Sequence, residues 1–379
     1  MLRRIYVDNY TCFVDFRLDL PGRLVIVGSN GSGKTSLWDV LAALQDVIVR
    51  GVDVASAFST RTLTRWKPTE TTQRFGLDVR VDGDTYVYQL YVAHDPVRQL
   101  PSVLLERLTS GGQTLYEAAD GVVSLFGEES FPVPRTRFRF GRKRSFLPDI
   151  EGAEDRRTVA FRDAVANFWL LAASSRRIES TSASEAPWLN RDGQNFASWF
   201  RSALQERPGL GAVLLDALRP VMPGLRDLGL VPISKDVREL MLTFQIQGSE
   251  PYRLSVGELS DGQRSLVVLY GFLVGALDHA SLAFLDEPEM GLAPHEIQPW
   301  LARMSKVLDA RDGQAVVISH HPAVVDYISP ANAVRFSRPG GGPAQIQEVT
   351  LETTGGASVS EWISRPWAYD DEVGDAEQP

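Results

Sequence analysis

The stretch of sequence that decides the fold is a glycine-rich loop that reads Gly28, Ser29, Asn30, Gly31, Ser32, Gly33, Lys34 and Thr35. It follows the apolar run at residues 23–27 and opens a helical pattern at residues 34–49, so the local order is strand, loop, helix. The loop fits the pattern G-x-x-x-x-G-K-[S/T], in which glycines let backbone N–H groups turn toward phosphate oxygens. Lys34 is predicted to reach the β- and γ-phosphates of a nucleotide, and the Thr35 hydroxyl to ligate Mg²⁺. The alternative is a plain glycine turn before a helix, and the flanking strand and helix favour the phosphate site.

A second apolar run, residues 282–285, ends in two carboxylates, Asp286 and Glu287. Nucleoside triphosphatases place such acids at the carboxyl end of a parallel strand. Asp286 is predicted to hold Mg²⁺ through water, and Glu287 to take a proton from the attacking water as general base. By itself, a strand that ends in two acids is as often a solvated strand end, and the phosphate loop favours the metal site.

The composition is that of an ordinary globular protein, with 379 residues, 44% hydrophobic and 23% charged. The length predicts two or three domains, or one large α/β unit with insertions. The single cysteine and the absence of a leader-like start favour the cytoplasm. The longest apolar run, residues 265–277, is shorter than a membrane span, so it predicts a buried helix and no membrane insertion.

Three extended segments, at residues 74–81, 85–92 and 103–109, predict an antiparallel meander whose first turn is the run 82–84. Helical spacing at residues 155–218, interrupted by polar residues near 180–184, predicts a mostly helical lobe. Further along, strands are expected at 237–247, 282–285 and 315–319, and helices at 260–277 and 297–308. Their alternation predicts a parallel sheet covered on both faces. No sustained heptads occur, so no long coiled coil is expected.

Charge is distributed unevenly along a chain whose net charge is −9. One basic segment is a candidate contact to the DNA backbone, with six basic side chains: Arg135, Arg137, Arg139, Arg142, Lys143 and Arg144. Alternation with Phe138 and Phe140 predicts a strand with its arginines on one exposed face. The alternative is a solvated edge strand, or a contact to the acidic tail at residues 370–379, which is predicted to be disordered.

Four motifs in order, GSNGSGKT, ELSDGQRS at 258–265, LAFLDEPEMGLAP at 282–294 and VVISHHP at 316–322, carry a family resemblance. The chain resembles the ABC-type ATPase heads of the SMC and RecF class over about residues 1–335. It looks closest to short AAA-type ATPases related to the ATPase half of OLD-family proteins. The resemblance implies an α/β P-loop NTPase fold with a mixed sheet, an antiparallel meander and a helical lobe.

The same resemblance implies a domain division. The head would span residues 1–338, with lobe I at about 1–150 plus 280–338 and the helical, signature-bearing lobe at about 151–279. Residues 339–379 would form a C-terminal extension that ends in the acidic tail.

The resemblance to these heads implies a dimer that closes face to face around two ATP molecules, each with Mg²⁺. Ser260, Gly262 and Gln263 of the signature loop, defined here as residues 258–265, would then contact the nucleotide bound at the other subunit's Lys34. His320 would hydrogen-bond the γ-phosphate and orient water. The plain alternatives are a helix cap at Ser260 and a structural role for His320.

The sequence departs from the family pattern at several points. Asp261 stands where ABC heads often have glycine, and the run at residues 9–13 lacks the usual arginine beside the nucleotide. No glutamine is evident at residues 171–177, where the resemblance implies a metal-sensing loop, and Ser174 or Ser175 is the candidate substitute. Ala293 replaces the histidine of DEPE-x-x-L-H-P.

The predicted function is an ATPase that converts ATP to ADP and phosphate. It would act as a molecular switch on DNA or on a partner effector, in genome maintenance or phage defence. Only about forty residues follow Ser337 and they lack a nuclease pattern, so an effector such as a nuclease would be a separate protein. A transporter-like ATPase subunit is one alternative, disfavoured by the long segment between Thr35 and Leu259. A non-hydrolysing scaffold is another, disfavoured by the intact Lys34, Asp286 and Glu287.

Overall fold

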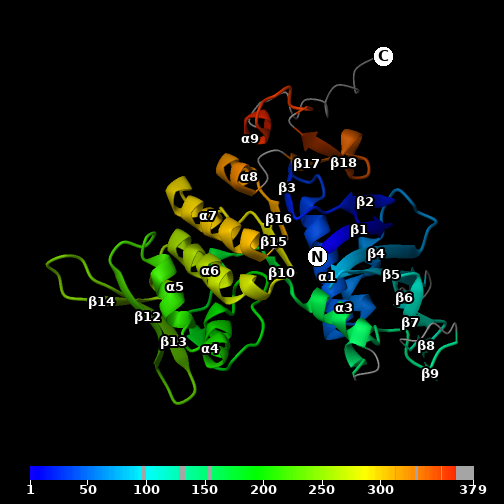
Figure 1. Ribbon diagram of the computed structural model, residues 1–379, viewed down its shortest axis with the longest axis horizontal. Coiled ribbons are helices and arrows are strands. Elements are labelled where there is room, and N and C mark those ends of the chain that lie inside the picture. Colours follow the sequence, from blue (N-terminus) through cyan, green and yellow to red (C-terminus); the bar gives the residue numbers. More distant parts are fainter. Residues whose placement is uncertain are drawn as a thin grey trace. The chain divides into compact units, whose positions relative to one another are not determined.

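The computed structural model describes residues 1–95, 100–127, 133–151, 156–311, 313–328, 332–350 and 352–363 (Figure 1). The chain divides into two compact units, Met1–Phe168 with Ser329–Pro379, and Trp169–Ile328. The lobe limits that the family resemblance implies stay a prediction. The tail at 370–379 lies outside the described residues.

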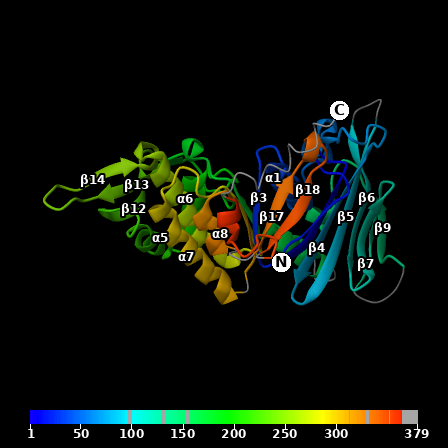
Figure 2. The same ribbon diagram turned by 90° about the horizontal axis from the view of Figure 1, so that it is seen from above.

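An antiparallel sheet of eight strands dominates the first unit, in the order β2-β1-β4-β5-β6-β7-β8-β9. Its strands are β1 (Leu2–Asp8), β2 (Phe16–Asp19), β4 (Thr72–Val81), β5 (Asp84–His94), β6 (Pro101–Ser110), β7 (Gln113–Ala119), β8 (Val122–Leu125) and β9 (Thr136–Arg139). Seen from above in Figure 2, these strands run alongside one another. Asp82 and Gly83 both have positive φ (50° and 94°), as a tight hairpin turn requires. The meander predicted from residues 74–109 is therefore confirmed.

Helix α1 (Lys34–Arg50) packs against α3 (Arg156–Ala166) in the same unit. The buried Gln45 side chain ties the two helical segments together, because its Nε2 donates to the carbonyls of Val165 (3.0 Å) and Phe168 (2.6 Å). Phe161 of α3 stacks on Tyr88 of the meander with 5.6 Å between ring centroids. Shorter helices lie at α2 (Val54–Ala57), η1 (Thr60–Thr62) and η2 (Leu147–Asp149).

Strand β3 (Arg23–Gly28) leads into the glycine-rich loop and is buried over nearly its whole length. It pairs in parallel with β17 (Asn332–Ser337), which in turn pairs antiparallel with β18 (Gln345–Thr350). Because β3 and β17 are parallel, the loops that follow them emerge at the same edge. The segment after β17 contains η7 (Pro339–Gly341), and α9 (Val359–Ile363) follows β18.

The second unit has a parallel strand pair, β15 (Leu282–Asp286) and β16 (Ala315–Ile318), and β10 (Phe168–Leu171) leads into the unit. Its helices are α4 (Phe196–Glu206), α5 (Leu210–Leu218), α6 (Asp261–Gly275), α7 (Pro294–Arg311) and α8 (Pro322–Ile328), with single turns η4 (Ser175–Arg177), η5 (Val256–Glu258) and η6 (Leu277–His279). The helices and strands expected between 260 and 319 are confirmed. Within the described ranges no helix exceeds the 18 residues of α7, and none is long and apolar enough to cross a membrane.

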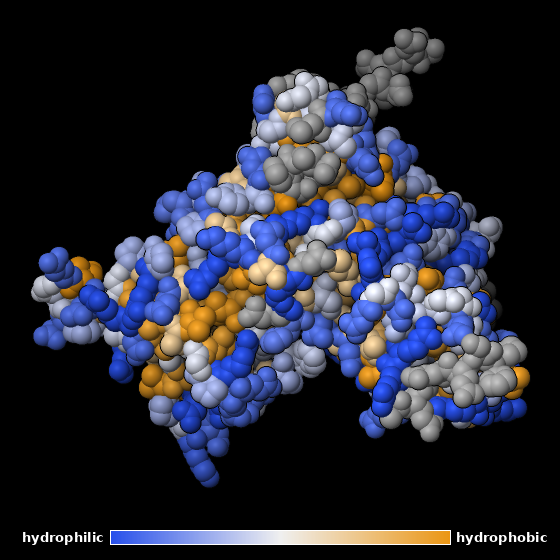
Figure 3. All heavy atoms as spheres, in the orientation of Figure 1, coloured by the Kyte–Doolittle hydropathy of each residue, from blue (hydrophilic) through white to orange (hydrophobic). Residues whose placement is uncertain are grey.

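An antiparallel arm, defined here as β12 (Leu225–Pro232), β13 (Arg238–Phe244) and β14 (Tyr252–Ser255), extends from the second unit, with β11 (Thr181–Ser182) beside β13. It lies at the far left of Figures 1 and 3, where its surface is mostly hydrophilic. The mostly helical lobe predicted for residues 155–218 contains α3, α4 and α5, but its non-helical part is longer than expected, because residues 168–195 form β10, η4, β11 and loops. The polar run near 180–184 marked that interruption, but β12 was missed because Gly229 and Pro232 weaken its strand pattern.

Candidate nucleotide site

The phosphate loop, residues 28–35, has the backbone that its glycines predict. Gly28, Gly31 and Gly33 have φ values of 145°, 79° and 111°, a region that other residues rarely adopt. Gly28 is also confined by packing, because a Cβ there would lie 2.2 Å from the carbonyl oxygen of Phe336. Gly33 directly precedes α1, so the loop leads into a helix N-terminus, where backbone N–H groups and the helix dipole favour an anion.

Lys34 is held inside this loop. Its Nζ donates to the carbonyl oxygens of Gly28 (2.5 Å) and Ser29 (3.0 Å), and the residue is only 7% exposed. The buried Ser32 hydroxyl has no hydrogen-bond partner in the part of the chain that the structure describes. A buried cation, an orphaned hydroxyl and a helix N-terminus together fit a phosphate group.

Arg338, which the sequence analysis did not select, anchors the outer side of the phosphate loop. Its guanidinium donates to the carbonyls of Gly31 (3.2 Å), Gly341 (2.9 Å) and Gly342 (2.9 Å), and it lies 5.2 Å from the centre of the Trp66 ring. No local pattern could have revealed this contact, because Arg338 and Gly31 are 307 residues apart.

Cys12 lies in the run at residues 9–13, where the resemblance described above would predict an arginine. It is buried, and its carbonyl accepts from the N–H of Ala344 (2.8 Å). A Cβ on Gly33 would lie 2.8 Å from the Cys12 sulfur, so this side chain packs against the phosphate loop. In place of the expected arginine, the run at residues 9–13 therefore provides a packing contact between Cys12 and the phosphate loop.

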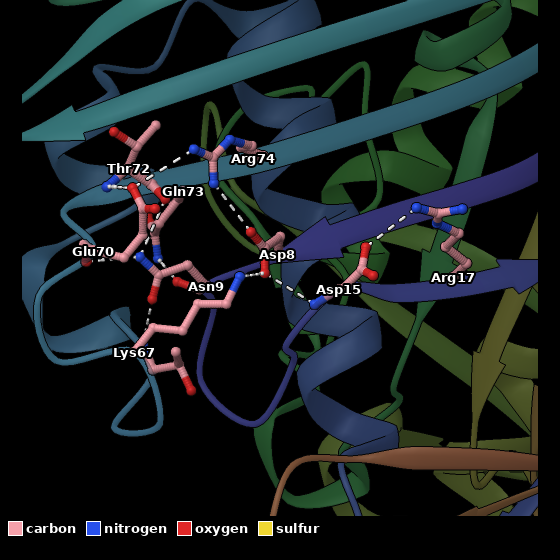
Figure 4. Close-up of polar contacts among 10 residues, drawn as sticks. Asp8, Asn9, Asp15, Arg17, Lys67, Glu70, Thr72, Gln73 and Arg74 are labelled. Atoms are coloured by element: carbon pink, nitrogen blue, oxygen red, sulfur yellow. Dashed lines mark hydrogen bonds and ion pairs between the residues drawn. The ribbon is translucent and has the colours of Figure 1, made fainter.

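Polar contacts at the end of β1 fix the loop that contains Cys12 (Figure 4). The buried Asp8 carboxylate accepts from Lys67 (2.6 Å), Arg74 (3.1 Å) and the Asp15 N–H (2.9 Å). Burial alone would raise the pKa of Asp8, but these donors outweigh it and hold the pKa below its usual value. Asn9 is fully buried at φ 60°, and its amide donates to the Glu70 and Thr72 carbonyls.

In the second unit, Asp286 ends β15 and Glu287 follows it in a left-handed conformation, φ 46°. The Glu287 N–H donates to the carbonyl of Ile318 at the end of β16 (2.9 Å). A left-handed glutamate costs on the order of 1 kcal/mol and is retained where the surroundings enforce it. The separate roles predicted for Asp286 and Glu287 stay predictions.

His320 lies next to a hydrogen-bonded pair that the sequence analysis missed. The Ser319 hydroxyl donates to Oε1 of Glu289 (2.5 Å) and accepts from the His321 N–H (3.0 Å). Within the described ranges the other carboxylate oxygen of Glu289 is buried without a hydrogen-bond partner, and burial raises the pKa of this carboxyl. Glu289 stands three residues after Asp286, the predicted metal ligand, and Ser319 directly precedes His320. The Ser319–Glu289 hydrogen bond therefore links the two segments that carry these predicted site residues.

The signature loop ends in a helix cap. The Ser260 hydroxyl accepts from the Gln263 N–H (3.3 Å), and Gln263 Oε1 accepts from the Ser260 N–H (3.1 Å), a capping box at the start of α6. Gly262 is required by close packing, since a Cβ there would lie 3.0 Å from the Gly291 carbonyl. The helix-cap reading of Ser260 is thus confirmed, and the contacts of Ser260, Gly262 and Gln263 to a nucleotide stay predictions.

The structure places the phosphate loop in the first unit, and Asp286, Glu287, His320 and the signature loop in the second. Ser174 donates its N–H to the Asp192 carbonyl (3.0 Å), and Ser175 begins η4. Among the described residues no group of three His, Cys, Asp or Glu side chains could hold a metal by itself. Mg²⁺ commonly takes only one or two protein ligands plus phosphate oxygens, so the metal roles of Thr35 and of Asp286 stay predictions.

Comparisons with known proteins identify the fold. No family model matches the chain. A solved SMC head, bound to the C-terminal winged-helix domain of ScpA, is 13% identical with a TM-score of 0.57, covering 93% of this chain and 98% of that one. The Smc head from Pyrococcus furiosus, bound to the C-terminal domain of ScpA, is also 13% identical, with a TM-score of 0.55 and coverages of 93% and 97%. The chain therefore has the fold of an SMC head domain.

Among curated proteins, a short stretch resembles Protein ea59 of Escherichia phage lambda, with 33% identity over 70 residues. That stretch covers 18% of this chain and 13% of ea59. The resemblance to OLD-family proteins stays a prediction.

Proposed function

We propose that this protein is an ATPase of the SMC-head class, which binds ATP with Mg²⁺ and hydrolyses it to ADP and phosphate as a molecular switch. The observation that carries the proposal is the phosphate loop, where left-handed glycines surround the buried ammonium of Lys34 at the start of α1. The fold of SMC heads supports it.

The proposed chemistry assigns each side chain one task. The Lys34 ammonium exchanges the carbonyls of Gly28 and Ser29 for β- and γ-phosphate oxygens, a stronger, charge-assisted contact. Thr35 and Asp286 would hold Mg²⁺, which neutralises charge on the phosphates. Glu287 takes a proton from water as the water oxygen bonds to the γ-phosphorus, while the bond to the β–γ bridging oxygen breaks and its electrons leave with ADP. His320 orients this water.

We also propose the homodimer that closes over two nucleotides, with Ser260, Gly262 and Gln263 facing the partner's γ-phosphate. Its support is the signature motif together with the position of Ser260, exposed at the N-terminus of α6. Regulation through a partner protein is the proposed output, and two SMC heads with this fold were solved with ScpA domains bound. Genome maintenance and phage defence are the proposed settings.

DNA is a second proposed partner, through the basic segment at residues 135–144. Strand β9 lies at the edge of its sheet, and Phe138 and Phe140 pack edge-on against Phe146 while Arg137 and Arg139 are exposed. The six basic residues are not equivalent. Arg142 donates to the Val103 carbonyl (3.0 Å) and Arg144 pairs with Asp149 (2.7 Å), so these two have other contacts within the protein.

The decisive experiment compares the wild-type protein with Lys34→Ala. We expect Mg²⁺-dependent ATP hydrolysis by the wild-type protein, and loss of both hydrolysis and ATP binding in the variant, with unchanged circular dichroism. Equal ATP affinity in the two proteins would refute the nucleotide site. Arg50→Ala, at the far end of the same helix, is the control and should retain activity.

A further inference from the structure

The signature loop contains an electrostatic conflict at Asp261. A carboxylate in the first turn of α6 stabilises the helix, because it faces the positive end of the helix dipole. The same carboxylate opposes any phosphate that approaches Ser260 and Gly262, which flank it in sequence. If the N-terminus of α6 receives an anion, a cation must offset Asp261.

Arg176 in η4 supplies that cation. Its Nε lies 3.5 Å from Oδ2 of Asp261, and the two side chains are 86% and 49% exposed. Backbone hydrogen bonds of Arg177 to Ser174 (2.9 Å) and of Ser174 to Asp192 (3.0 Å) hold η4 in place. The guanidinium of Arg176 is therefore positioned beside the start of α6 but is not buried there.

The neighbouring arginines, Arg264 and Arg177, make other contacts. Arg264 comes within 4.0 Å of Asp261, but its guanidinium donates to the carbonyls of Leu259 (2.9 Å) and Gly257 (3.0 Å). Arg177 pairs with Asp192 at 3.1 Å. An exposed ion pair such as Arg176–Asp261 contributes about 0–1 kcal/mol, so Arg176 can exchange its partner at little cost.

We propose that Arg176 acts across the dimer, leaving Asp261 to contact the γ-phosphate held by the partner subunit's phosphate loop. The inference rests on the proposed composite site and adds a catalytic residue to it. A planar guanidinium can bind phosphate oxygens through two N–H groups and offset the charge of the transition state. It also gives the site an arginine, although the run at residues 9–13 has none.

The first test uses single variants of the full-length chain. We expect Arg176→Ala to lower kcat at least about tenfold, since arginines that act on transferring phosphoryl groups contribute large factors, with ATP affinity of the phosphate loop retained. Arg177→Ala is the matched control from the same turn and should retain activity. If the double variant Arg176→Ala with Asp261→Asn regains the wild-type rate, Arg176 merely neutralises Asp261 and the proposal fails.

The second test distinguishes action across the dimer from action within a subunit, using mixtures of inactive variants. Arg176→Ala mixed with Lys34→Ala should recover activity, because one composite site combines an intact phosphate loop with the other subunit's intact Arg176. Ser260→Arg places a bulky cation where the signature loop is proposed to face the γ-phosphate, so this variant should itself be inactive. Arg176→Ala mixed with Ser260→Arg should stay inactive, because each site then lacks either Arg176 or Ser260. The reverse pattern would place Arg176 in its own subunit's site and overturn the proposal.

A third mixture separates this inference from the function on which it rests. Ser260→Arg with Lys34→Ala should recover activity whatever Arg176 does. If it does not, although heterodimers are shown to form, the composite site itself is wrong and the trans role of Arg176 is refuted with it.

Discussion

Glu287 combines an unfavourable backbone with a proposed catalytic role. Its left-handed φ of 46° occurs directly after β15, where its N–H donates to the carbonyl of Ile318. Strain of this kind persists where the surrounding structure enforces it and often coincides with function.

Glu287→Gln should therefore bind ATP without hydrolysing it, because glutamine keeps the size and polarity of the side chain but cannot take a proton. Closed dimers should accumulate, which sedimentation with and without Mg-ATP can detect. Finding only monomers at concentrations far above the site's dissociation constant would contradict the face-to-face dimer. Glu287→Asn is a useful second variant, since asparagine tolerates left-handed φ and should keep the fold while abolishing hydrolysis.

The Ser319–Glu289 hydrogen bond positions the segment that carries His320. Removing either partner should lower kcat with little change in ATP affinity, because neither side chain belongs to the phosphate loop. In a double-mutant cycle, Ser319→Ala with Glu289→Ala should cost no more than one single change. Glu289→Gln keeps an acceptor for Ser319 and should retain most of the rate. Fully additive losses would show that the two residues act independently.

At the scale of single elements, the meander contains a buried carboxyl on β6. Glu106 is fully buried and accepts hydrogen bonds from Tyr88 (2.8 Å), Tyr116 (2.7 Å) and Ser145 (2.6 Å). Burial raises its pKa, and the three donors offset this only in part. The sequence offered no warning, because a glutamate in a strand usually faces water.

This raised pKa gives stability a definite pH dependence. Below about pH 4.3 the carboxyl is protonated in both the folded and the unfolded chain, and at higher pH only the unfolded chain loses the proton readily. The contribution of Glu106 to the free energy of unfolding therefore falls as the pH rises from the unfolded pKa through the folded one. Glu106→Gln should remove this dependence, as urea unfolding at pH 5 and pH 8 would show. Asp84→Asn, at an exposed turn, is the control and should behave like the wild type.

Helix α6 depends on glycines that helix propensity alone would reject. A Cβ on Gly271 would lie 2.3 Å from the Phe196 ring, so α4 and α6 can pack this closely only because that atom is absent. Gly271→Ala should destabilise the protein by about 1–3 kcal/mol. Gly211→Ala in α5 meets only ordinary contacts, the nearest at 3.5 Å, and should be neutral or stabilising by up to about 1 kcal/mol. Thermal unfolding of both variants would test this contrast. Equal shifts of the two midpoint temperatures would contradict it.

At the scale of the whole molecule, the net charge of −9 makes a local basic surface informative, because the chain as a whole repels nucleic acid. The structure changes how that surface should be tested. Arg142 contacts Val103 and Arg144 contacts Asp149, whereas replacing the exposed Arg137, Arg139 and Lys143 leaves both of these contacts in place.

Replacing Arg137, Arg139 and Lys143 with Glu should weaken binding to duplex DNA and flatten its salt dependence, by up to about one unit of slope per lost phosphate contact. ATPase activity without DNA should not change. The matched control replaces Lys235, Arg238 and Arg253 of the arm with Glu, which alters the net charge equally and should leave DNA affinity intact. Unchanged affinity and slope in the first variant would reject the segment as a DNA contact.

The sequence by itself determined the elements whose signals are local. The run 28–35 specified a strand, a phosphate loop and a helix because glycine spacing and the flanking apolar patterns act over a few residues, and alternation specified the meander for the same reason. Only the tertiary structure decided the groups that support these elements. Arg338 reaches Gly31 across 307 residues, Glu289 meets Ser319 across 30, and Arg176 approaches Asp261 from a turn the sequence did not specify. Such contacts depend on how distant segments pack, which no periodicity along the chain encodes.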